Sequence, residues 1–150
     1  MKSTHNIPRW IPIVMLMFAL FGFADASYLS AEHFTGGTPV CTVIQGCDIV
    51  TTSVYATIGP VPVALLGAVY YFALILGLVV YLDKRSVRWL RSVAFLPMLG
   101  FGFTLYLVYL MAFVIDAWCI YCLGSATSTI VLFVLALFIL WRTRTTALHG

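Results

Sequence analysis

Four cysteines are the residues of this sequence best suited to chemistry. They form two pairs, Cys41 with Cys47 and Cys119 with Cys122. The second pair has the C-x-x-C spacing of redox-active dithiols and stands where an apolar run begins. A helix that starts there favours the thiolate of Cys119, because its positive dipole end stabilises negative charge, and the thiolate is the nucleophile of thiol–disulfide exchange. This spacing predicts redox chemistry at Cys119 and Cys122.

The cysteines allow three interpretations. Two structural disulfides are an ordinary use of an even number of cysteines, and Cys41 with Cys47 would make a short loop staple. Four thiolates could hold zinc, but the C-x5-C spacing is wider than in most zinc sites, so we expect no metal. In a relay, the loop pair (Cys41 and Cys47) would take electrons from a soluble dithiol and pass them to the C-x-x-C pair (Cys119 and Cys122).

The chain that carries these cysteines has the composition of a membrane protein. Of its 150 residues, 63% are hydrophobic and only 9% are charged, and the mean hydropathy is +1.06. Soluble domains are typically about 25% charged, so a soluble enzyme is excluded. The net charge of +3 comes from only eight Lys and Arg, which excludes a basic surface for nucleic acid.

Four apolar runs predict an all-α integral membrane protein, a four-transmembrane-helix bundle that forms one membrane domain in the lipid bilayer. The runs cover about 11–28, 61–82, 92–115 and 117–141. Since a span needs roughly 20 apolar residues, the last three are long enough to cross a bilayer and the first is marginal. A long outer loop over 30–60 joins the first two spans. Pro97, with Gly100 and Gly102, is expected to bend the third.

The first run has a second interpretation. Lys2 and Arg9 precede its apolar core, and Ala24-Asp25-Ala26 resembles a cleavage site, which is the pattern of a signal peptide. Cleavage there would leave the following loop on the same outer side. Asp25 itself is either an interfacial charge or a proton-handling group, because an ionisable residue inside a span is a functional candidate.

The basic residues all agree on one orientation. They precede the first span, lie between the second and third, or follow the fourth: Lys2, Arg9, Lys84, Arg85, Arg88, Arg91, Arg142 and Arg144. The positive-inside rule therefore predicts that both termini and the middle loop are cytoplasmic. All four cysteines then lie on the outer face, where disulfides persist. An acceptor for electrons that reach the C-x-x-C pair could be a membrane quinone held between the helices.

Several motifs together resemble the vitamin K epoxide reductase family over nearly the whole chain. These are Cys41-x5-Cys47-Asp48, Ser53-Val54-Tyr55-Ala56, Pro60-Val61-Pro62-Val63-Ala64, Gly67, and Cys119-x-x-Cys122 at the start of the last span. The combination is specific, whereas C-x-x-C alone would be weak. The five-residue gap between the loop cysteines is similar to the prokaryotic branch, which implies a prokaryotic cell (inner) membrane.

The resemblance implies a bundle around a quinone, either ubiquinone or menaquinone, that serves as electron acceptor. Cys41 would exchange with a protein partner, Cys47 would pass electrons through a transient disulfide with Cys119, and Cys122 would lie nearest the quinone. The sequence ends soon after the fourth span, so we expect the partner to be a separate, exported thioredoxin-like protein. Its reoxidation would drive disulfide formation in exported proteins.

The resemblance also assigns contacts with the quinone, to Ser53, Val63, Leu66, Cys122 and Ala126. Animal members have an Asn and a Tyr near the quinone carbonyls, where this chain has Val63 and Ala126, so it favours quinone reduction over epoxide reduction. Hydroxyls could come instead from residues 125, 127 and 128, although serine and threonine in helices usually bond their own backbone. Ser53 has the alternative role of a local turn cap.

The expected function is that of a membrane thiol:quinone oxidoreductase. A second quinone-linked family of disulfide oxidases carries its C-x-x-C in the first outer loop, and the reversed order here argues against it. An alternative from another class is a tetraspan structural or transport protein with two structural disulfides.

Overall fold

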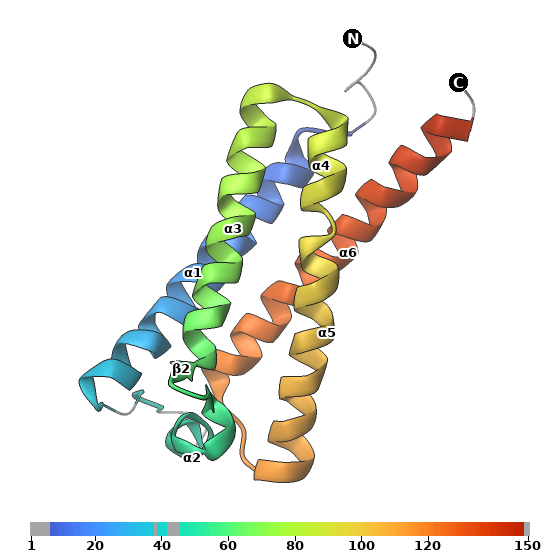
Figure 1. Ribbon diagram of the computed structural model, residues 1–150. Helices are drawn as coiled ribbons and strands as arrows, with labels where there is room; N and C mark the ends of the chain where they lie inside the picture. Colours follow the sequence, from blue (N-terminus) through green and yellow to red (C-terminus); the bar gives the residue numbers. More distant parts are fainter. Residues whose placement is uncertain (1–6, 38, 42–45, 149–150) are drawn as a thin grey trace.

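Four long helices make up the computed structural model, which describes residues 7–37, 39–41 and 46–148 (Figure 1). They are α1 (Trp10–Thr35), α3 (Val63–Lys84), a third span built from α4 (Val87–Val93), α5 (Leu96–Tyr109) and the π-helical η3 (Leu110–Ile115), and α6 (Ile120–Leu148). All four are long and apolar enough to cross a membrane. The predicted four-helix membrane fold is thus confirmed.

The first helix is longer than its apolar run. We expected it to end near residue 28 and the outer loop to begin at residue 30, but α1 continues to Thr35. It stops at Gly36, whose φ of 71° is left-handed and whose N–H donates to the Glu32 carbonyl. Glycine adopts this conformation at little cost, so it ends the helix where hydropathy gives no signal.

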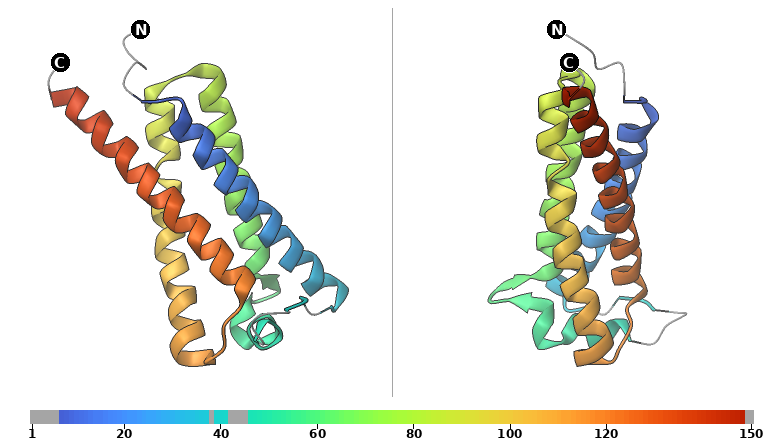
Figure 2. Two further views of the ribbon diagram at one scale, coloured as in Figure 1. Left: turned by 180° about the vertical axis from the view of Figure 1, so that it is seen from behind. Right: turned by 90° about the vertical axis from the view of Figure 1, so that its right-hand side faces the viewer.

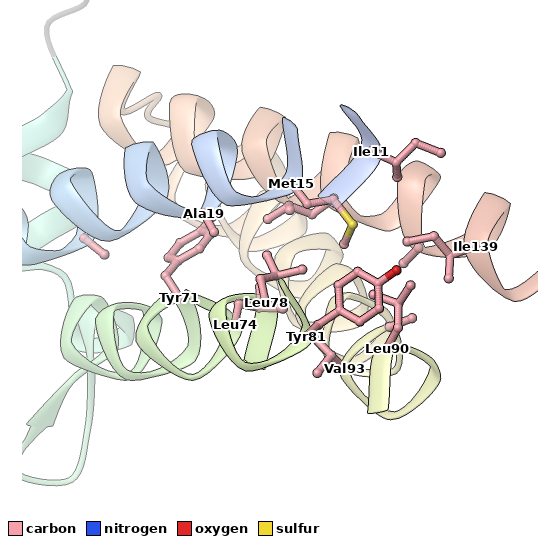
Figure 3. Packing of buried hydrophobic residues seen from close by; sticks show 14 of the residues in the cluster. Ile11, Met15, Ala19, Tyr71, Leu74, Leu78, Tyr81, Leu90, Val93 and Ile139 are labelled. Atoms are coloured by element: carbon pink, nitrogen blue, oxygen red, sulfur yellow. The ribbon is translucent and has the colours of Figure 1, made fainter. Parts of the chain in front are cut away.

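The first helix is also part of the hydrophobic core. Ile11, Met15 and Ala19 are completely buried on α1. Figure 3 shows Ala19 beside Tyr71 of α3 and Ile11 beside Ile139 of α6, and Leu74 and Leu78 of α3 are fully buried in the same cluster. Removal of a signal peptide would delete these core contacts, so the packing favours a retained span.

The third span begins earlier than expected and is broken once. The helix starts at Val87 instead of residue 92, so Arg88 lies in its first turn; a long arginine side chain can reach the aqueous interface from there. The expected bend is a break between α4 and α5. Pro97 is the second residue of α5, a position that tolerates its missing N–H.

The other span boundaries shift by a few residues. The second span runs from 63 to 84 instead of 61 to 82. The fourth starts at Ile120 instead of residue 117, because Asp116 adopts a left-handed φ of 51° and the chain stays non-helical until α6 begins. The C-x-x-C pair therefore straddles a helix start.

The bundle places α1 between α3 and α6, while α5 packs mainly on α6 (Figure 2). Small residues permit the closest approaches. A Cβ at Gly22 on α1 would overlap the ring of Tyr71, and one at Gly77 on α3 would lie 2.8 Å from a Val93 methyl group of α4. Because α3 and α5 touch only sparsely, space is left between them at one end of the bundle.

The loop between α1 and α3 closes that end. It carries α2 (Cys47–Thr52), the short 3-10 helix η2 (Val54–Ala56), and a two-residue antiparallel hairpin of β1 (Thr57–Ile58) and β2 (Val61–Pro62) that turns at Gly59. Figure 1 shows this loop and the η3–α6 turn at one end, with the start of α1 and the end of α6 at the other. All four cysteines belong to the loop end.

Candidate functional site

The loop pair is a disulfide. Cys41 and Cys47 are bonded, with their Cα atoms 6.2 Å apart. Cys47 is the first residue of α2 and is completely buried, whereas Cys41 is half-buried. The sulfur of Cys41 is therefore the easier one for a second protein to reach.

The C-x-x-C pair consists of two free thiols at the start of α6. Cys119 is completely buried just before the helix, and Cys122 is half-buried in its first turn. The backbone N–H of Cys122 donates to Sγ of Cys119 at 3.4 Å. The described cysteines thus form one disulfide and one dithiol in this structure.

The two pairs touch. Cys47 and Cys119 belong to one buried cluster with Met111, and Cys41 and Cys122 pack against it. The four cysteines predicted from the sequence thus come together, although about seventy residues separate the pairs. This proximity is the geometric requirement for thiol–disulfide exchange between pairs.

Two contacts hold the pairs in this arrangement, one between two backbone segments and one between a side chain and a backbone carbonyl. Gly46 lies so close to the backbone of Trp118 that a Cβ at position 46 would be 2.7 Å from the Trp118 carbonyl oxygen. The hydroxyl of Tyr121 donates to the carbonyl of Val40 at 3.2 Å. Each contact joins a neighbour of a loop cysteine to a neighbour of a C-x-x-C cysteine, so the loop cannot shift without moving the disulfide from the thiols.

The thiol of Cys119 is the more acidic group that exchange requires. The pKa of Cys119 is lowered to about 7, mainly by a hydrogen bond with the Cys122 side chain and in smaller part by backbone N–H groups at the helix start. Burial and the negative charge of Asp25 act in the opposite direction. A large share of Cys119 is therefore thiolate near neutral pH.

This acidity gives a testable pH dependence. We expect alkylation of Cys119 by iodoacetamide in the reduced protein to rise with pH through a midpoint of about 7. The thiolate dominates above that pH and is lost as the pH falls through it, because the pKa is lowered. Cys122→Ala removes the side-chain hydrogen bond and should move the midpoint towards about 8.5, the value of an ordinary cysteine. Mass spectrometry of the Cys119 peptide measures both profiles, and equal midpoints would contradict the assigned cause.

A cavity of about 400 Å³ lies beside the cysteines, between α1, α3, α5 and α6. Its wall is mostly apolar. The residues assigned to quinone contacts all line it: Ser53, Val63, Leu66, Cys122 and Ala126. Cys122 is the one cysteine in the wall, so the structure puts it at the junction between the cavity and the cysteine cluster.

The hydroxyl groups near the cavity divide into two kinds. Ser53 donates to the Val50 carbonyl at 2.8 Å, which is the local cap that we considered as its alternative role. Thr127 and Ser128 bond the backbone one turn earlier in α6, as expected for helical hydroxyls. Ser125 differs, because its hydroxyl lies 2.9 Å from the Tyr71 hydroxyl on another helix.

Three polar residues of the wall are placed differently from what the sequence suggested, or were missed. Asp25 does not stand at the helix end, since α1 continues for ten more residues, and its Oδ2 is buried at the cavity. Tyr70 and Tyr71 also line the cavity. Two adjacent tyrosines within an apolar span were the available signal, since a buried Tyr needs a partner for its hydroxyl.

A metal site is not supported by the arrangement. Among the residues that the structure describes, no group of three or more His, Cys, Asp or Glu side chains could hold a metal ion. Two of the four sulfurs are already joined to each other.

Comparison with known proteins gives one family. The sequence model described as the vitamin K epoxide reductase family matches residues 13–137, which include both cysteine pairs and most of the chain. No curated protein matches the sequence.

Proposed function

The chain belongs to the vitamin K epoxide reductase family, and from this premise we propose that it is a thiol:quinone oxidoreductase that reoxidises an exported thioredoxin-like protein. Family membership already makes it a membrane thiol oxidoreductase. The observation that carries the rest is the single buried cluster of four cysteines at the edge of an apolar cavity.

The first half of the reaction would take place at the loop pair. A thiolate of the partner attacks Cys41, which forms a mixed disulfide and releases the Cys47 thiolate; the second partner thiol then displaces Cys41. The partner leaves as a disulfide, and the loop pair keeps its two electrons and two protons as a dithiol. The greater exposure of Cys41 relative to Cys47 supports this order of attack.

The second half would pass the electrons inward. Cys47 attacks an oxidised C-x-x-C pair at Cys119, and Cys41 then displaces Cys119 from the mixed disulfide. The products are a loop disulfide and a C-x-x-C dithiol, which is the redox state of this structure.

The cavity fits a quinone ring in size and chemistry. Ligand pockets for small molecules are typically about 300–1,000 Å³ and largely apolar, with a few polar groups. Two buried polar atoms in this wall, Asp25 Oδ2 and Tyr70 OH, have no hydrogen-bond partner in the described part of the chain. A bound quinone would supply an acceptor for two electrons and two protons, whether ubiquinone or menaquinone.

The positions of the basic residues support an orientation in the membrane. Arg9, Lys84, Arg85 and Arg142 belong to the end of the bundle that holds the start of α1 and the end of α6. By the positive-inside rule this end faces the cytoplasm, here of a prokaryotic cell, and the cysteines face outward to an exported partner.

Purified protein tests the proposal directly. With a reduced thioredoxin-like donor and a short-chain ubiquinone, we expect the wild type to form hydroquinone and donor disulfide in equal amounts. Cys41→Ala should lose at least about a hundredfold in rate with the protein donor, because the accessible sulfur is gone. Full activity of Cys41→Ala would refute the role of this cysteine. An inert wild type would favour the structural or transport alternative.

A further inference from the structure

Asp25 is a half-buried carboxyl group within α1, and one of its two oxygens has no hydrogen-bond partner among the described residues. It stands ten residues before the end of α1 at Thr35, about 15 Å along the helix axis. Its Oδ2 atom is buried and has no hydrogen-bond partner among the described residues. It shares the wall of the cavity with Cys122.

Tyr70 of α3 presents a second buried group without a partner. Its hydroxyl is buried and makes no hydrogen bond within the described chain, and the residue lines the same cavity. Its neighbour Tyr71 is the opposite case, since that hydroxyl lies 2.9 Å from the Ser125 carbonyl and from the hydroxyl of Thr129. Hydrogen-bond partners are therefore present in this region of the bundle, and yet the Tyr70 hydroxyl has none among the described residues.

The ring of Tyr70 is held in place by its surroundings. It packs edge to face on Tyr71, with ring centroids 5.1 Å apart. On the other side it touches α5 at Gly100, where a Cβ would overlap the Tyr70 hydroxyl. Gly100 thus makes room for a polar atom that the folded chain itself does not use.

Two unpartnered groups in one cavity wall need a physical reason. A buried polar group without a hydrogen bond costs about 1–3 kcal/mol, more for a charged one. A ligand that offers hydrogen-bond acceptors would remove the cost at the Tyr70 hydroxyl and, with Asp25 protonated, the cost at its carboxyl group as well. Quinones carry two carbonyl oxygens, and the apolar side chains of Val63 and Ala126 in the wall cannot bond them. Asp25 and Tyr70 are unpartnered polar groups of this wall that can.

We propose that Tyr70 and Asp25 form the polar end of the quinone site in this chain, with Tyr70 donating a hydrogen bond to one carbonyl oxygen and Asp25 transferring protons. The proposal rests on the quinone oxidoreductase function proposed above. Oxidation of the Cys119–Cys122 dithiol to a disulfide releases two electrons and two protons, and quinone reduction consumes the same numbers. Protonated Asp25 donates to a carbonyl oxygen and is reprotonated from the C-x-x-C thiols, so no other reactant is needed.

Tyr70 and Asp25 have different roles in this proposal, since Tyr70 contributes to quinone binding and Asp25 to proton transfer. Tyr70→Phe should weaken the binding of oxidised short-chain ubiquinone about fivefold to tenfold, as expected for one lost hydrogen bond. Asp25→Asn should bind it within about twofold of wild type yet reduce it at least about tenfold more slowly, because an amide is not a proton donor of this kind. Quenching of tryptophan fluorescence measures binding, and stopped-flow absorbance measures reduction. Tyr106→Phe and Asp83→Asn, both at exposed positions, serve as matched controls.

A second measurement detects a purely structural role. Without quinone, Tyr70→Phe should unfold at the same or a higher temperature than wild type, because it deletes an unsatisfied group. A lower unfolding temperature together with unchanged quinone binding would overturn the assignment of Tyr70, and wild-type reduction by Asp25→Asn would overturn that of Asp25. A wild-type chain that neither binds nor reduces quinone would instead refute the proposed function itself.

Discussion

Replacing Cys122 with alanine is expected to reduce electron transfer to quinone by on the order of a thousandfold or more, because it deletes the sulfur that the relay requires at the cavity. Cys122 is the one cysteine in the cavity wall, so no other thiol of the chain can replace it there. Hydroquinone formation with a reduced thioredoxin-like donor measures the loss.

The same variant should also trap an intermediate. Without Cys122, the Cys119 thiolate can attack Cys47 of the loop disulfide, and the mixed disulfide that forms can then be opened only by the return of Cys41, because the thiol that would resolve it towards a Cys119–Cys122 disulfide is gone. Non-reducing peptide mass spectrometry should detect a Cys47–Cys119 bond. Thr127→Ala is the control on the same helix, because its exposed side chain only bonds its own backbone. Quinone reduction by Cys122→Ala at the wild-type rate would rule out the relay.

Local patterns in the sequence predicted most of the fold and part of the site. Apolar runs identify spans because the bilayer imposes their length, and the basic residues mark one end of the bundle. The four cysteines were identifiable because their spacing is itself the chemical signal. The ends of the helices were harder to predict from the sequence. The first helix, for example, stops at Gly36 because this glycine adopts a left-handed conformation, and no change in hydropathy marks the position.

The contacts that create the site could not be read from the sequence. They join Gly46 to Trp118, Tyr121 to Val40 and Tyr70 to Gly100, and each depends on how two distant segments pack. The cavity could not be predicted for the same reason, because it forms where the distant helices α3 and α5 make few contacts with each other. Asp25 was visible as an intramembrane acid, but its place on the cavity wall follows only from the length of α1 beyond it.

Gly46 provides the sharpest test of how the two cysteine pairs are held together. A Cβ at this position would lie 2.7 Å from the Trp118 carbonyl oxygen and 3.2 Å from its backbone nitrogen, and backbone atoms cannot rotate away as a side chain can. Gly46→Ala must therefore push Cys47 away from Cys119. Overpacking of this kind costs about 1–3 kcal/mol, which corresponds to a roughly fivefold to 150-fold slower transfer between the pairs.

Cross-linking measures this displacement without any donor or acceptor. In a Cys41→Ala, Cys122→Ala background, Cys47 and Cys119 are the two remaining cysteines, and we expect them to form a disulfide readily under mild oxidation. Adding Gly46→Ala should slow this bond by the same factor, whereas Gly102→Ala should not, because nothing lies within 4 Å of a Cβ there. In the otherwise wild-type chain, Gly46→Ala should still let the donor reduce the loop disulfide, since Cys41 keeps its exposure. If cross-linking were equally fast with alanine and with glycine at position 46, the contact between the Gly46 and Trp118 backbones would not determine the distance between the sulfurs of Cys47 and Cys119.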